Sequence, residues 1–88
     1  MSEKARTYSY DTEKVDELTL ALLYLGTHRR DKQSGARAWK SFDWDAMSRL
    51  HEKGFISDPV SKSKSVAIYE EAYERSKELF EKHFAKSE

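Results

Sequence analysis

The stretch from Arg37 to Ile68, RAWKSFDWDAMSRLHEKGFISDPVSKSKSVAI, constrains the fold of this chain more than any other part of the sequence. Trp39 and Trp44 open a short run with helical periodicity, and Gly54 is placed to end it. The only proline then follows in a turn, after which a Ser/Lys-rich loop leads into an apolar segment typical of a strand. A short helix, a tight stop, a basic loop and a strand in this order favour an α+β fold.

We expect a helix over residues 43–53, capped by Ser41 or Asp43. The two tryptophans are expected in the core, since a small chain needs its largest side chains there. If exposed, they would instead offer a stacking platform for single-stranded bases or for a partner's side chain. The predicted helix has an apolar face of Trp44, Met47, Leu50 and His51 and a polar face of Asp45, Ser48, Arg49, Glu52 and Lys53.

Two longer helices are expected on either side of this stretch. Residues 12–26 carry Val15, Leu18, Leu22 and Leu25 at helical spacing, widened by other leucines, which predicts a largely buried helix that forms the spine of the core. Residues 70–84 combine aromatic residues on one face with acidic residues near the start and basic residues near the end, as the helix dipole favours.

The remaining segments are expected to be short strands and loops. Residues 28–36 read as a polar, flexible loop, while 38–42 and 65–69 read as short strands that pair in a ribbon. The predicted fold class is α+β, mostly helical, with three helices plus a small two-stranded ribbon. Residues 1–10 are predicted to be a flexible N-terminal arm, and residues 11–86 a single compact domain.

Composition narrows the class of protein. The 88 residues carry 16 basic and 16 acidic side chains, so the formal net charge is zero. Residues 28–64 hold nine basic and five acidic side chains, which makes the centre of the chain basic. No cysteine is present, which excludes disulfide scaffolds and thiol nucleophiles. The apolar run at residues 18–25 is far shorter than the roughly 20 residues that span a bilayer. We expect a cytoplasmic protein without a membrane partner.

The block AWK.FDW..M..LHEKG.ISDPV.K.KSV, together with the helices before and after it, resembles a small bacterial family known as a domain of unknown function. The resemblance covers about residues 10–84, which is nearly the whole chain. The family resemblance implies a fold neighbourhood and no particular chemistry.

A second resemblance is to winged-helix regulators. The run from Leu50 to Ile56, a loop, and the run from Lys64 to Ile68 are similar to a recognition helix, a wing and the strand after it. The resemblance implies a winged-helix-like fold in which the helix and the wing contact duplex nucleic acid. Residues 43–53 and the Ser/Lys loop 61–65 would then form the binding surface.

Two function hypotheses follow, and neither is an enzyme. In the first, a non-enzymatic module binds nucleic acid: basic residues contact phosphates, and residues of the helix reach base edges. In the second, a protein-interaction module acts as a homodimer, an adaptor or a small inhibitor of a larger complex. In the first hypothesis, the residues that contact phosphates would be Arg37, Lys40, Lys62 and Lys64, and those that contact bases would be Ser48, Arg49 and Lys53.

The sequence contains no recognisable catalytic, cofactor or metal motif. The three histidines, His28, His51 and His83, fall on different predicted elements without ligand spacing. The serines lack a nucleophile elbow, and three glycines form no phosphate-binding loop. We therefore expect no catalytic residue, no cofactor, no metal and no small-molecule ligand.

Overall fold

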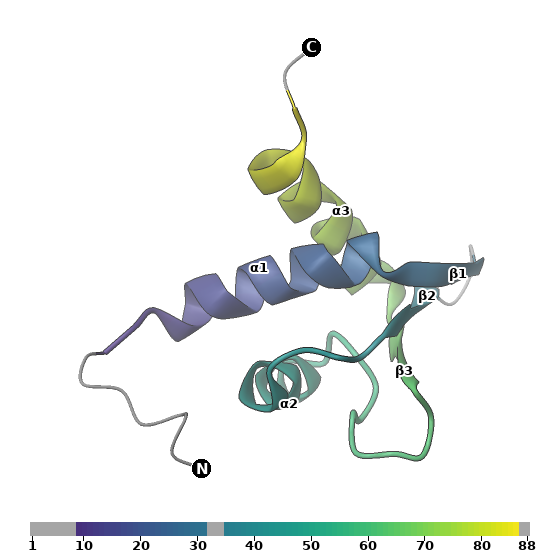
Figure 1. Cartoon of the computed structure of the whole chain (residues 1–88). Coiled ribbons are helices and arrows are strands. Elements are labelled where there is room, and N and C mark those ends of the chain that lie inside the picture. Colours follow the sequence, from purple (N-terminus) through teal and green to yellow (C-terminus); the bar gives the residue numbers. More distant parts are fainter. Residues whose placement is uncertain (1–8, 32–34, 87–88) are drawn as a thin grey trace.

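The computed structural model describes residues 9–31 and 35–86, which form an α+β fold. Its elements are α1 (Thr12–Leu25), β1 (Thr27–Asp31), β2 (Gly35–Trp39), α2 (Trp44–Glu52), β3 (Ser65–Ile68) and α3 (Glu70–Phe84) (Figure 1). The strands form one antiparallel sheet in the order β1-β2-β3. The predicted fold class and its three helices are confirmed, but the ribbon has three strands rather than two. Most of the predicted N-terminal arm, residues 1–8, lies outside the described residues.

The segment predicted to be a flexible loop, residues 28–36, is instead a β-hairpin where it is described. Thr27 pairs with Ala38 and Asp31 with Gly35, and the register shifts between Thr27 and Arg29. The prediction was wrong because β1 is almost wholly exposed and polar, so it has no alternation of apolar residues. β2 begins at Gly35 rather than at residue 38. The prediction missed its first residues because the buried side of this strand is made of small alanines, which give a weak apolar signal.

Gly35 has a backbone conformation and a close backbone neighbour that only glycine tolerates. Its φ is +111°, and a Cβ placed there would lie 1.9 Å from the carbonyl oxygen of Ile68. Only glycine allows both this backbone conformation and this close approach of the chains. β2 can therefore lie directly against the end of β3.

Local signals set both ends of α2. The Asp43 side chain accepts a hydrogen bond from the amide of Ala46, which caps the first turn. At the other end Gly54 has a φ of 80°, and the amide of Phe55 donates to the carbonyl of Leu50, as in a Schellman motif. The predicted helix stop at Gly54 is confirmed.

The chain after α2 returns to the sheet beside β3. Ile56 forms a bridge with Ile68, and the amide of Ser57 donates to the carbonyl of Ala67 at 3.0 Å. The loop of residues 58–64 connects these two antiparallel segments. Helix, short pairing segment, loop and strand thus follow one another along this part of the chain.

The core lies between the sheet and the inner sides of the three helices. Leu20 and Leu23 of α1 are 1% and 0% exposed, and they belong to one cluster with Met47, Leu50 and Ile68. Aromatic rings extend the packing between α1 and α3, where Tyr24 lies 5.5 Å from Tyr73 and 5.4 Å from Phe80 between ring centroids. α1 crosses in front of α3, whose C-terminal half continues past it (Figure 1).

The outer side of α1 differs from the prediction. Val15, Leu18 and Leu22 are only partly buried, and Leu25 is 65% exposed. The buried stripe runs instead through Asp16, Leu20 and Leu23, spaced i, i+4, i+7. The molecule is only 19 Å across its shortest dimension, about two layers of secondary structure. Helices α2 and α3 therefore leave one side of α1 uncovered.

Candidate functional site

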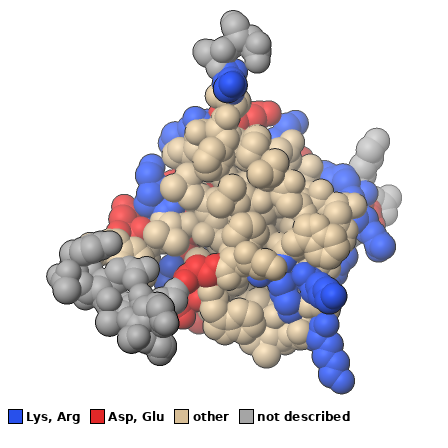
Figure 2. Space-filling model, in the orientation of Figure 1, with Lys and Arg blue, Asp and Glu red and all other residues tan. Residues whose placement is uncertain are grey.

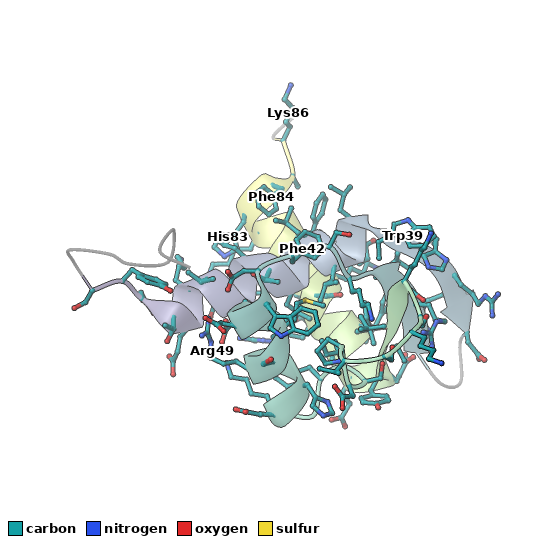
Figure 3. The ribbon with its side chains drawn as sticks, turned by 60° about the horizontal axis from the view of Figure 1, so that its bottom comes forward. Trp39, Phe42, Arg49, His83, Phe84 and Lys86 are labelled. Carbon is teal, nitrogen blue, oxygen red and sulfur yellow. The ribbon has the colours of Figure 1, made fainter. Side chains whose placement is uncertain are left out.

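The uncovered side of α1 is the centre of an apolar face. Leu18, Leu22 and Leu25 are one or two turns apart, so their side chains project from the same side of the helix. Phe42, which precedes α2, and Phe84, at the end of α3, extend this face on either side of α1 (Figure 3). We call the set Leu18, Leu22, Leu25, Trp39, Phe42, Trp44 and Phe84 the apolar face.

Both tryptophans are half exposed, so the prediction that they lie in the core was wrong. Trp39 is 51% and Trp44 52% exposed. Trp39 is the last residue of β2, at a position whose side chain alternates away from the buried alanines. It stacks on His28 of β1, with ring centroids 4.1 Å apart and planes inclined by 28°. Trp44 is the first residue of α2, before the buried turn that contains Ala46 and Met47.

The apolar face is also largely without charge. Figure 2 shows a broad expanse of uncharged residues across the side that α1 occupies, with Lys, Arg, Asp and Glu arranged around it. Phe84 is 43% exposed and its ring lies 5.4 Å from Phe80, so the aromatic packing between α1 and α3 continues to the surface. A contiguous apolar surface with a polar rim is typical of a protein-interaction site.

Two of the residues predicted to contact bases have partners within the protein. Asp16 is 2% exposed. The Nε and Nη2 atoms of Arg49 donate to the two carboxylate oxygens of Asp16 at 2.8–3.0 Å. The Nζ atom of Lys53 lies 3.3 Å from Oδ2 of the same carboxylate. The pKa of Arg49 is raised above its ordinary value, because the hydrogen bonds to Asp16 outweigh the opposing effect of desolvation. Arg49 and Lys53 therefore join α2 to α1.

Two residues predicted to contact phosphates instead hold the Ser/Lys loop. The Nη2 atom of Arg37 donates to the carbonyl of Ser65 at 3.0 Å, and its Nε to the Ser65 hydroxyl at 2.9 Å. The Nζ atom of Lys40 donates to the carbonyls of Pro59 and Ser61 at 2.7 Å and 3.0 Å. These bonds satisfy backbone carbonyls of the loop and tie it to β2 and the segment after it.

Of the remaining predicted residues, one lies on α2 and two lie in the loop. Ser48 is partly buried on α2, whereas Lys62 and Lys64 are exposed in the loop. Among the described residues, neither of these two lysines has a side-chain partner. The seven predicted residues thus form no single surface: two lie beside Asp16, and four lie in the loop or contact it.

A second ion pair ties the β1–β2 hairpin to α3. The Arg30 guanidinium donates to both carboxylate oxygens of Glu70 at 3.0 Å, and it lies 4.2 Å from the ring centroid of Tyr73. The same guanidinium donates to the carbonyl of Gly35 at 2.8 Å. The hydrogen bond to Glu70 raises the pKa of Arg30. The position of β1 thus depends on a contact between residues far apart in the sequence.

Sequence reasoning missed the buried carboxylate and the apolar face. The signal for Asp16 was its spacing to Leu20 and Leu23, which places an acid on the buried stripe. Within residues 9–31 and 35–86, no three His, Cys, Asp or Glu residues are grouped so that they could hold a metal ion. No helix in these residues is long and apolar enough to cross a membrane.

The fold and this surface define a class: a small α+β domain with an apolar face. The family model described as a domain of unknown function (DUF6429) matches residues 11–86, so the chain belongs to that family. It is 46% identical over 76 residues to the "Uncharacterized protein y4hR" of Sinorhizobium fredii (strain NBRC 101917 / NGR234), covering 86% of this chain and 96% of that protein. The predicted membership of a bacterial family is confirmed. No solved structure matches the chain.

Proposed function

We propose that this protein is a non-enzymatic protein-interaction module that binds its partner through the apolar face. The observation that carries the proposal is the exposure of Trp39, Trp44 and Leu25, each more than half open to solvent. Exposed tryptophans cost a small domain apolar burial that it could use for stability. Tryptophan is also the residue most enriched among the side chains that dominate binding energy at interfaces.

The arrangement of charges supports the same choice. Arg49, Lys53, Arg37 and Lys40 make hydrogen bonds within the protein, and these would compete with contacts to nucleic acid. The apolar face needs no such rearrangement. A partner that covers it removes apolar surface from water without breaking a hydrogen bond of the fold.

Photocrosslinking in the native host tests this function. A photoreactive benzophenone residue replaces Leu25 on the apolar face or, in the control, Lys77 on the exposed side of α3. We expect a covalent protein adduct from position 25 and none from position 77. Equal adducts from both positions, or none from position 25 in a folded protein, would overturn the proposal.

Exposed basic residues at the sheet end support a second candidate function, weak contact with nucleic acid in the cytoplasm. Lys62 and Lys64 are exposed without side-chain partners, and Arg29 is exposed on β1. Two or three phosphate contacts would give weak binding that is strongly reduced by salt. Titration with duplex DNA at low ionic strength tests this. Binding that is lost in a Lys62→Ala, Lys64→Ala double variant supports the candidate, and unchanged or absent binding counts against it.

A further inference from the structure

We propose that the partner of the apolar face is a second copy of this chain, related by a two-fold axis so that the two α1 helices run antiparallel. This inference rests on the proposed function, because it names the occupant of the same surface. Its support comes from the symmetry of the face, from the distribution of charge along α1, and from the area that a stable dimer needs.

The first argument is the arrangement of residues along α1. A two-fold interface brings the same patch of both subunits together, so the patch must complement itself. Leu22 lies near the middle of the stripe, between Leu18 and Leu25. In an antiparallel pair that crosses near Leu22, Leu18 of each copy faces Leu25 of the other. Apolar side chains would then meet apolar side chains along the whole helix.

The second argument is electrostatic. The N-terminal end of α1 carries Asp11, Glu13 and Glu17 against Lys14, whereas the sheet end of the molecule is basic. Figure 2 shows Lys and Arg side chains at the end where the sheet lies, and others at the left and at the top of the molecule. An antiparallel arrangement places the acidic end of each copy beside the basic end of the other, and a parallel one places like charges together. The basic residues of the sheet end include Arg29, Arg37, Lys62 and Lys64.

The third argument is size. A stable interface buries about 800 Å² on each partner, which is roughly an eighth of the 6253 Å² surface of this chain. The 14 residues of α1 are about 21 Å long. Trp39 extends the face beyond the C-terminal end of the helix, and Phe42 and Phe84 widen it on either side (Figure 3). A standard dimer contact would thus have to cover α1 together with these flanking residues.

Sedimentation equilibrium over a range of concentrations tests the oligomeric state. We expect the wild-type chain to have twice its mass of 10.3 kDa at high micromolar concentration. Leu25→Glu and Trp44→Ser should each raise the dimer dissociation constant by about tenfold or more. The matched control is Tyr69→Ser, which removes an aromatic residue of similar exposure, 45%, from the start of α3. A monomeric wild type, or equal effects of all three variants, would overturn the proposal.

Cysteine cross-linking tests the antiparallel arrangement. Because the chain has no cysteine, single substitutions give unambiguous disulfides. Leu22→Cys is expected to oxidise to a symmetric dimer, and Lys77→Cys is not. In an equimolar mixture, Leu18→Cys and Leu25→Cys should pair with each other in preference to themselves, since a disulfide needs Cα atoms within about 7 Å. Preferential pairing of each variant with itself would contradict the antiparallel axis.

The photocrosslinking result separates this inference from the function on which it rests. An adduct from position 25 with twice the mass of the chain supports both proposals. An adduct with a different protein, together with a monomeric wild type, supports the interaction module and rejects the second copy. No adduct from a folded protein rejects both.

Discussion

Asp16 is the buried charge on which the packing of α1 against α2 depends. It is 2% exposed, and it accepts hydrogen bonds from both Arg49 and Lys53. A carboxylate in such a position is costly unless its oxygens are paired. The contact also explains why two residues predicted to reach base edges turn toward the protein. At this scale the sequence held a usable signal, because Asp16 shares helical spacing with Leu20 and Leu23.

Replacement of this carboxylate should destabilise the fold. Asp16→Asn leaves the Arg49 guanidinium partly buried without its charged partner, and we expect a loss of about 2–3 kcal/mol in the free energy of unfolding. Urea denaturation followed by tryptophan fluorescence measures it. Glu78→Gln, at an exposed position of α3, should change stability by less than about 0.5 kcal/mol. Similar values for the two variants would show that the Asp16 contact contributes little.

Substitution of alanine for either of the two glycines with positive φ should destabilise the fold, but by different amounts. Gly35→Ala places a Cβ 1.9 Å from the Ile68 carbonyl oxygen, and we expect a loss of about 3 kcal/mol or more. Gly54→Ala meets open space and has only the left-handed backbone against it, so we expect about 1 kcal/mol. Chemical denaturation of both variants measures the difference. Equal losses would mean that the close approach of β2 to β3 is relieved at little cost.

The helices were more predictable than the strands, for reasons visible in particular elements. The spacing of apolar residues predicts α3 over the same residues that form it, 70–84, and places α2 within one residue at each end. β1 could not be predicted, because its side chains are exposed and its position depends on the distant contact between Arg30 and Glu70. The sequence also could not predict which side of α1 faces the core, because that depends on the placement of α2 and α3.

The Ser/Lys loop of residues 61–65 should loosen without unfolding the domain when its anchor on β2 is removed. Arg37→Gln loses the guanidinium bonds to the Ser65 carbonyl and hydroxyl. We expect faster hydrogen exchange of loop amides and a global loss of only about 1 kcal/mol. Hydrogen exchange read out by mass spectrometry of loop peptides measures this. Unchanged exchange in the loop would show that Lys40 alone is a sufficient anchor.

For the whole molecule, the main consequence of its two-layer thickness is an uncovered side. A thicker domain would bury both sides of α1 under other elements. Here the sheet, α2 and α3 leave the apolar face open across a molecule 19 Å thick. In the proposed dimer, stability and association would be coupled, because covering this face removes apolar surface that the fold alone does not bury.

This coupling predicts that the melting temperature depends on protein concentration. If only the folded chain dimerises, dilution from high to low micromolar concentration should lower the melting temperature by several degrees. Added salt should weaken the association further, because it screens the attraction between the acidic N-terminal end of α1 in one copy and the basic sheet end of the other. Scanning calorimetry measures both effects, with Leu25→Glu as the control that should melt independently of concentration. A concentration-independent wild type would contradict the coupling.

The irregular first strand also limits how copies of this protein can aggregate. β1 is an edge strand, and edges of this kind are templates on which further chains can add. Its register shifts between Thr27 and Arg29, and the charged side chains of Arg29, Arg30 and Asp31 line it. Interruptions and charges of this kind oppose the growth of a continuous sheet from chain to chain. An edge of this kind is a poor template for fibril growth, so the proposed association would use the helical side of the domain.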